Sequence, residues 1–233
     1  MQRILYELKG RGDLRFSPYC WRALMALAHK GIAVERVPLN YTAMPEKLNP
    51  LGASAVPVLV DGDNAIADSW LIAQYLERTY PDRPSLFGGP VGEQFAAFVN
   101  RWADRGLHPT LMHVIAHDIY DNVDAVDQPY FKKTRETRLG KSLEYIRRDS
   151  QATAAGLTKI LEPLRAQLAA QPFLSGAAPL YPDYVVFGTL QWSRCASTFP
   201  LLTADDVLWA WRGRMLDLYG GLGRNAAACD EVA

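Results

Sequence analysis

The sequence predicts two unlike domains, a small α/β domain over residues 1–81 and an all-helical domain over residues 92–233. Short apolar runs alternate with helical periodicity in the first part, and this alternation is typical of an α/β unit. Proline and glycine then gather over residues 82–91, which predicts a linker. Beyond it, strand patterns vanish. A chain of 233 residues is long enough for two such domains.

The first domain is expected to contain four strands, over residues 3–8, 33–39, 56–61 and 65–67. A helix over residues 17–30 lies between the first two strands, and this order favours their parallel pairing. The last two strands flank Asp61–Asn64, whose turn-forming residues predict a hairpin. A final helix over residues 68–80 ends at Pro81, which cannot continue it.

The second domain is expected to contain five amphipathic helices, over residues 93–111, 132–148, 153–170, 183–196 and 205–219. Residues 113–129 carry no clear pattern, and the tail over 220–233 is rich in small residues.

Composition narrows the classes of partner. The 25 basic and 25 acidic side chains give no net charge, and no dense basic run predicts binding to nucleic acid. We also expect no membrane partner and a cytoplasmic protein, since no apolar run reaches about 20 residues and no signal peptide pattern appears. The cysteines are Cys20, Cys195 and Cys229, an odd number with no metal-type spacing, which predicts neither disulfides nor a metal site.

The start of the first helix carries the clearest chemical signal. Proline is tolerated at the first helical position, so Pro18 makes Ser17 the expected N-cap residue. The free backbone N–H groups and the helix dipole at that point favour an anion such as a thiolate. An ordinary serine cap would give the same pattern, so Ser17 is a candidate site residue rather than an established one.

Two further segments are candidates for the same site. A cis bond at Val56-Pro57 would turn the Val56 backbone toward a peptide-like ligand, whereas a trans bond would make Pro57 an ordinary edge proline. Asp68 and Ser69 open a helix and either cap it or bind the charged end of an α-amino acid. We expect these two segments and Ser17 to converge at the strand ends.

These residues carry a family resemblance. Residues 3–87 resemble the thioredoxin-like domain of cytosolic glutathione transferases, and the remainder resembles that family's all-α second domain. Four segments are similar to the bacterial β-aryl ether cleaving transferases and to fungal serine-type enzymes, namely 17–22, 68–73, 80–84 and 220–224. The resemblance implies a glutathione transferase, with glutathione as co-substrate and a homodimer as the assembly.

The resemblance also implies roles for individual residues. Glutathione would lie along Val56, with its thiol at Ser17 and its γ-glutamyl end at Asp68 and Ser69. Lys47 is a candidate for the glycyl carboxylate, with a merely solvated surface lysine as the alternative. The expected aromatic substrate pocket facing the thiol is formed by Tyr19, Trp102, Met112 and His113.

The implied reaction starts with a hydrogen bond from Ser17 to the glutathione sulfur. The thiolate then attacks a small apolar, aromatic electrophile, and cleavage of a β-aryl ether is one such reaction. Thiol–disulfide exchange with Cys20 as nucleophile is the enzymatic alternative, since Cys20 also lies in the first helical turn. A non-catalytic binding module is the other alternative. His29, His108, His113 and His117 are expected to have surface or capping roles.

Overall fold

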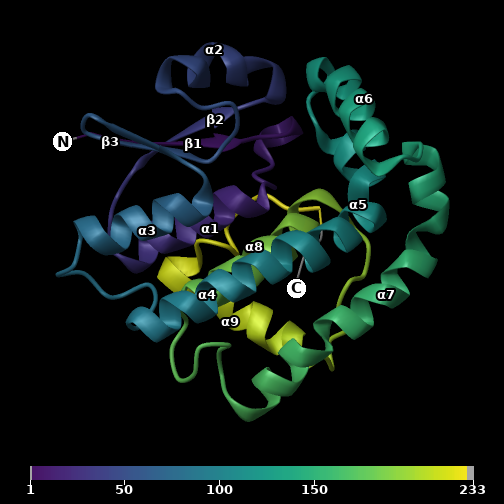
Figure 1. The fold of residues 1–233 in the computed structure, drawn as a ribbon. Helices are drawn as coiled ribbons and strands as arrows, with labels where there is room; N and C mark the ends of the chain where they lie inside the picture. Colours follow the sequence, from purple (N-terminus) through teal and green to yellow (C-terminus); the bar gives the residue numbers. More distant parts are fainter. Residues whose placement is uncertain (1, 230–233) are drawn as a thin grey trace.

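The computed structural model describes residues 2–229 and has the predicted fold class, an α/β domain followed by an all-helical domain (Figure 1). Four strands form one sheet in the order β2-β1-β3-β4. Their bounds are β1 (Arg3–Leu8), β2 (Glu35–Leu39), β3 (Val58–Asp61) and β4 (Asn64–Ala67). β1 and β2 are parallel, and the β3–β4 hairpin is antiparallel, as the sequence predicts.

The helices of the first domain lie on both sides of this sheet. α1 (Pro18–His29) and α3 (Ser69–Thr79) pack against each other on one side, and α2 (Met44–Leu48) lies on the other (Figure 1). The apolar periodicity of α1 has a direct structural cause, because Trp21 and Leu24 on that helix are both buried in the core. This packing holds the start of α1 at one end of the sheet.

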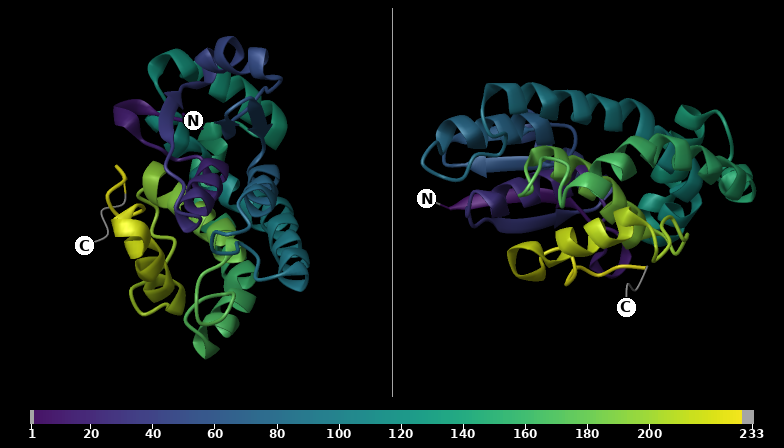
Figure 2. Two further views of the ribbon diagram at one scale, coloured as in Figure 1. Left: turned by 90° about the vertical axis from the view of Figure 1, so that its left-hand side faces the viewer. Right: turned by 90° about the horizontal axis from the view of Figure 1, so that it is seen from below.

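The second domain consists of α4 (Pro90–Trp102), α5 (His108–Asn122), α6 (Gln128–Leu139), α7 (Leu143–Ala170), α8 (Tyr181–Ala196) and α9 (Val207–Gly221). α8 is buried along its whole length and contacts α1, α4, α5 and α9 (Figure 1, Figure 2). It therefore joins the two domains. None of the helices in residues 2–229 is long and apolar enough to cross a membrane.

Two predicted helices have the wrong bounds. The helix predicted over 132–148 is interrupted at Gly140, which has a left-handed backbone with φ of 66° that favours glycine. Ser142 then caps α7, its Oγ accepting a hydrogen bond from the Tyr145 backbone N–H at 3.1 Å. From there one helix of 28 residues runs through the expected break before residue 153.

The helix predicted over 93–111 also differs from the structure. α4 passes through a π-helical turn, Ala103–Leu107, directly into α5, which continues to Asn122. The segment without a clear pattern, 113–129, is thus helical over much of its length. A π-helical turn inside an α-helix commonly lies at a functional site, and this one positions Asp104 next to a cavity.

Asp183 secures the start of α8 although Leu180 offers no capping hydroxyl. The Asp183 carboxylate is fully buried and accepts hydrogen bonds from the backbone N–H groups of Leu174, Ser175 and Leu180 at 2.8–3.3 Å. The Trp211 indole donates a further bond to it at 3.1 Å. One carboxylate therefore ties the preceding loop and α9 to the most buried helix of the protein.

We expect Asp183→Ala to lower the free energy of unfolding by about 3 kcal/mol or more, because it leaves several buried donors without an acceptor. Urea unfolding followed by circular dichroism measures this loss. Asp205→Ala removes an exposed carboxylate and serves as the control, with an expected change below about 0.5 kcal/mol. Equal losses in the two variants would contradict the role assigned to Asp183.

Candidate active site

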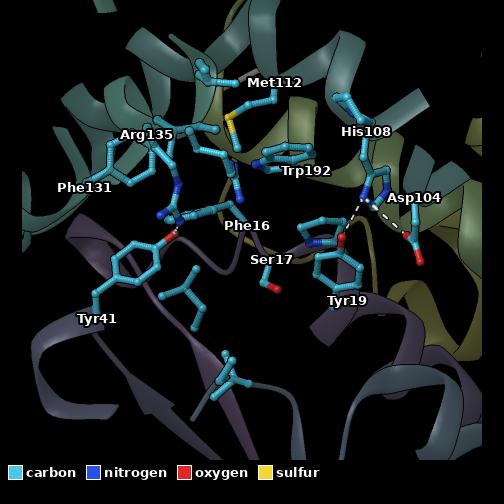
Figure 3. Close-up of a pocket in the computed structure, with 18 of the residues that line it drawn as sticks. Phe16, Ser17, Tyr19, Tyr41, Asp104, His108, Met112, Phe131, Arg135 and Trp192 are labelled. Atoms are coloured by element: carbon cyan, nitrogen blue, oxygen red, sulfur yellow. Dashed lines mark hydrogen bonds and ion pairs between the residues drawn. The ribbon is translucent and has the colours of Figure 1, made fainter. Parts of the chain in front are cut away.

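A cavity of about 590 Å³ opens between the two domains (Figure 3). Its walls come from the start of α1, the segment before β3, and helices α5, α6 and α8. Most of its larger side chains are aromatic or contain sulfur, and they are Phe16, Tyr19, Tyr41, Met44, Met112, Tyr130, Phe131 and Trp192. A cavity of this size and chemistry suits a ligand with an aromatic part.

Ser17 occupies the N-cap of α1, as the sequence predicts, and lines this cavity. Its Oγ accepts a hydrogen bond from the Cys20 backbone N–H at 3.3 Å. In this role the oxygen is an acceptor. The hydroxyl also hydrogen-bonds the Cys20 side chain, so a ligand sulfur at the helix start would compete with that thiol for the hydroxyl proton. In Figure 3 the Ser17 hydroxyl lies between the aromatic side chains of the two domains.

The Val56-Pro57 peptide bond is cis, as one of the two sequence alternatives requires. Val56 lines the cavity together with Ser17. The Pro57 carbonyl accepts a hydrogen bond from the Asp68 backbone N–H at 3.2 Å, which connects this segment to the start of α3. The segment at Val56 and Pro57 thus meets the start of α3. Of these two segments, the one that contains Val56 faces the cavity.

Asp68 is the N-cap residue of α3 and has a left-handed backbone, with φ of 81°. Its carboxylate accepts hydrogen bonds from the backbone N–H groups of Trp70 and Leu71 at 2.8 and 3.1 Å. Ser69 is buried, and its carbonyl accepts a bond from the Tyr181 hydroxyl at 2.9 Å. Asp68 and Ser69 lie next to Pro57 in space but do not line the cavity itself.

The structure separates the other predicted residues into two groups. Tyr19, Met112 and His113 line the cavity. Trp102 does not, because it lies at the end of α4 and packs half-buried against the core. Lys47 is also outside the lining, with its side chain 53% exposed and paired with Glu46 at 2.9 Å.

The surface or capping role predicted for His108 is wrong. His108 is buried, lines the cavity, and has its Nε2 3.0 Å from an Nη atom of Arg22. An arginine side chain only donates, so Nε2 accepts from Arg22, and the Thr189 hydroxyl, 2.5 Å away, is a second donor to the same nitrogen. Burial and the Arg22 charge lower the pKa of His108 well below its ordinary value, which leaves the ring neutral with its proton on Nδ1. That Nδ1–H donates to the Tyr19 hydroxyl at 3.3 Å.

The hydrogen bond from His108 determines how the Tyr19 hydroxyl can act. Its oxygen accepts from His108, so its own hydroxyl proton is directed to another acceptor. Tyr19 is 36% exposed and lines the cavity. Burial of the hydroxyl raises the pKa of Tyr19, and the phenol stays protonated near neutral pH. Tyr19 therefore presents a neutral hydrogen-bond donor within the same cavity as Ser17.

Most of this network joins residues that are far apart in the sequence. Asp104 accepts from Arg22 at 2.9 Å, and the Asn100 side chain accepts from the same guanidinium at 2.9 Å. Arg22 is separated from these partners by about eighty positions along the chain. The one local signal is the spacing of Asp104 and His108, which lie four positions apart on a continuous helical path.

Cys20 lies one helical turn after Ser17 but in a different environment. Its side chain is buried in the core and does not line the cavity. Burial raises the pKa of the Cys20 thiol to about 12, and the negative charge of Glu7 acts in the same direction. This is opposite to the lowered pKa that thiol–disulfide exchange at Cys20 requires.

The chain matches both domains of one protein family. Residues 13–84 match the N-terminal domain of glutathione S-transferases, and residues 94–220 match their C-terminal domain. Glutathione S-transferase 4 of Zea mays is 32% identical over 166 residues, which cover 69% of this chain and 66% of the relative. A zeta-class glutathione S-transferase of Euphorbia esula is 43% identical over 72 residues, covering 28% of this chain. The matched part spans about a third of the length of that relative.

Solved structures show the same fold. A glutathione S-transferase of Ceriporiopsis subvermispora in complex with glutathione superimposes with a TM-score of 0.80 at 23% identity. The superposition covers 94% of this chain and 98% of the fungal one. This likeness concerns the fold, and the family follows from the two domain matches, which together cover most of the chain. This protein is a member of the glutathione S-transferase family.

Proposed function

We propose that this protein is a glutathione transferase in which Ser17 lowers the pKa of the glutathione thiol for attack on an aromatic electrophile. The observation that carries this proposal is the position of Ser17. Its hydroxyl, at the N-terminus of α1, lines one cavity together with aromatic side chains from both domains. A hydroxyl donor and a helix N-terminus both stabilise a sulfur anion.

The peptide part of glutathione is proposed to lie along the segment before β3. The Val56 backbone, before the cis bond to Pro57, is proposed to pair with the cysteinyl residue. The γ-glutamyl end would extend toward Asp68 and Ser69, which the Pro57–Asp68 hydrogen bond holds next to this segment. Lys47 would have to leave its ion pair with Glu46 to reach the glycyl carboxylate.

Tyr19 supports the second half of the reaction. In cleavage of a β-aryl ether, a carbon–sulfur bond forms as the carbon–oxygen bond breaks, and the electron pair of that bond leaves on the aryl oxygen. The free Tyr19 hydroxyl, oriented by His108, is proposed to donate a hydrogen bond to this oxygen as negative charge develops on it. The aryloxide then takes up a proton from solvent, which balances the proton that the glutathione thiol lost, and a phenol and a glutathione thioether would be the products.

The two alternatives receive less support. Thiol–disulfide exchange would need a thiolate at Cys20, whose pKa is raised and whose side chain is buried away from the cavity. A binding module without catalysis would have no need for a protonated donor at Tyr19 beside the helix N-terminus at Ser17. A protein without measurable affinity for glutathione would revive that second alternative.

We expect Ser17→Ala to raise the pKa of bound glutathione and to slow turnover by about tenfold to hundredfold, because one hydrogen bond to a charged sulfur is lost. The absorbance of the thiolate in the ultraviolet, followed across pH, measures the pKa directly. Ser54→Ala is the matched control, since exposed Ser54 also lines the cavity but does not begin a helix. A thiol pKa that is the same in wild type and Ser17→Ala would refute the role of Ser17.

Cys20 is expected to resist alkylation in the native protein. With a pKa of about 12, only about one thiol in ten thousand is ionised at pH 8, and the side chain is also buried. Treatment with iodoacetamide followed by peptide mass spectrometry should label Cys20 only after unfolding. Half-buried Cys229 is the internal reference and should react faster. Rapid labelling of native Cys20 would restore the exchange mechanism.

Tyr19→Phe should lower kcat for aryl ether substrates by about tenfold to hundredfold, because a hydrogen bond to the departing oxygen is removed. The loss should grow as the leaving phenol becomes less acidic, since more charge then depends on the donor. A series of substituted aryl ethers measures this trend. Tyr130→Phe removes a hydroxyl elsewhere in the cavity and should leave the trend unchanged. A loss independent of the leaving group would exclude Tyr19 as the donor.

A further inference from the structure

Two arginines on α6, Arg135 and Arg138, line the cavity without an acidic partner among residues 2–229. Asp104 is the one carboxylate in the described lining, and it is already paired with Arg22. An aromatic cavity with two uncompensated positive charges does not suit a purely apolar ligand. The charge of the cavity therefore bears on which substrates it accepts.

Arg135 is held in place by aromatic rings rather than by a carboxylate. Its guanidinium carbon lies 4.7 Å from the centre of the Phe131 ring and 5.3 Å from that of Tyr41. One Nη donates to the Tyr41 hydroxyl at 3.2 Å and the other to the Thr134 hydroxyl at 2.9 Å, whereas the buried Nε has no hydrogen-bond partner among the described residues. Figure 3 shows the side chain reaching from α6 toward Tyr41, beside the space that Ser17 also faces. Its orientation is fixed while part of its donor capacity stays unused.

Arg138 adds a second charge to the same wall. Arg138 is exposed at the cavity three positions after Arg135 on α6, and partial desolvation and then the positive charge of Arg135 lower its pKa. A carboxylate bound at this wall would offset both positive charges and accept from the donors that face it. Two planar forks on one helix are well suited to carboxylate recognition.

We propose that the α6 wall of the cavity binds a carboxylate carried by the aromatic electrophile. The inference rests on the proposed function and specifies its substrate class, an aromatic acid. The surroundings of Arg135 favour this source of the carboxylate, because the Tyr41 ring lies 5.6 Å from that of Tyr130 and 6.0 Å from that of Phe131. Such a group of rings packs against an aromatic body better than against the glycyl end of a peptide.

Two product analogues test the proposal, the S-benzyl conjugate of glutathione and the same conjugate with a carboxylate at the para position of its ring. Both carry the whole of glutathione, so a difference in affinity reports the ring carboxylate alone. Isothermal titration calorimetry on the wild-type protein should show that the carboxylated conjugate binds about tenfold more tightly or better. Equal affinities would overturn the proposal.

Variants then locate the site. Arg138→Gln changes an exposed side chain, and Arg135→Gln changes the side chain that packs on the Tyr41 and Phe131 rings. Each substitution should reduce the preference for the carboxylated conjugate. Lys133→Gln removes an equal charge from the exposed face of α6, outside the cavity lining, and should retain the preference. A preference that survives both arginine substitutions would place the carboxylate elsewhere and refute the assignment.

The remaining outcomes separate the two proposals. If the arginine substitutions weaken glutathione and both conjugates by the same factor, the arginines bind the glycyl carboxylate, and the substrate assignment is wrong while the transferase proposal stands. If glutathione and both conjugates fail to bind wild type, the proposed function fails and the inference fails with it. Thermal unfolding of each variant shows whether that variant is folded. The comparison of the two conjugates on the wild-type protein tests the proposal even if a variant does not fold.

Discussion

The close contact between α8 and the start of α1 is the constraint on which the site depends. A side-chain carbon added at Gly188 would lie 2.5 Å from the Pro18 carbonyl oxygen, so no other residue fits there without a shift of the backbone. Since Pro18 follows Ser17 directly, this contact sets the distance between the N-cap hydroxyl and the helical domain. Trp192, one turn along the same helix, then reaches the cavity as part of its wall.

Burial of the Arg22 charge is the second constraint, and it acts across the same contact. A buried guanidinium needs acceptors. The Nη atoms of Arg22 have Asn100, Asp104 and His108 of the second domain as acceptors, whereas its buried Nε has no partner among the described residues. The requirement for acceptors fixes the His108 proton on Nδ1, and that proton orients Tyr19. A residue that satisfies a structural need thereby determines which donor faces the cavity.

The same helix start places two nucleophile-like side chains in opposite environments. Ser17 lies at the cap, beside the cavity, whereas Cys20 lies three positions later and faces the core. The two side chains are hydrogen-bonded neighbours across this first turn, but only Ser17 lines the cavity. Burial then makes the thiol a poor acid, and the hydroxyl alone is available to a ligand.

The sequence by itself determined the fold class, the cap at Ser17, the α3 cap at Asp68 and the hairpin, because each depends on local backbone chemistry or periodicity. It misplaced the break between α6 and α7, where a left-handed Gly140 overrides a continuous helical pattern. Only the tertiary structure decided that Arg135 would face the cavity, that His108 would be buried, and that Trp102 would not line it. Those outcomes depend on which helix packs against which, and periodicity identifies an apolar face without naming its partner.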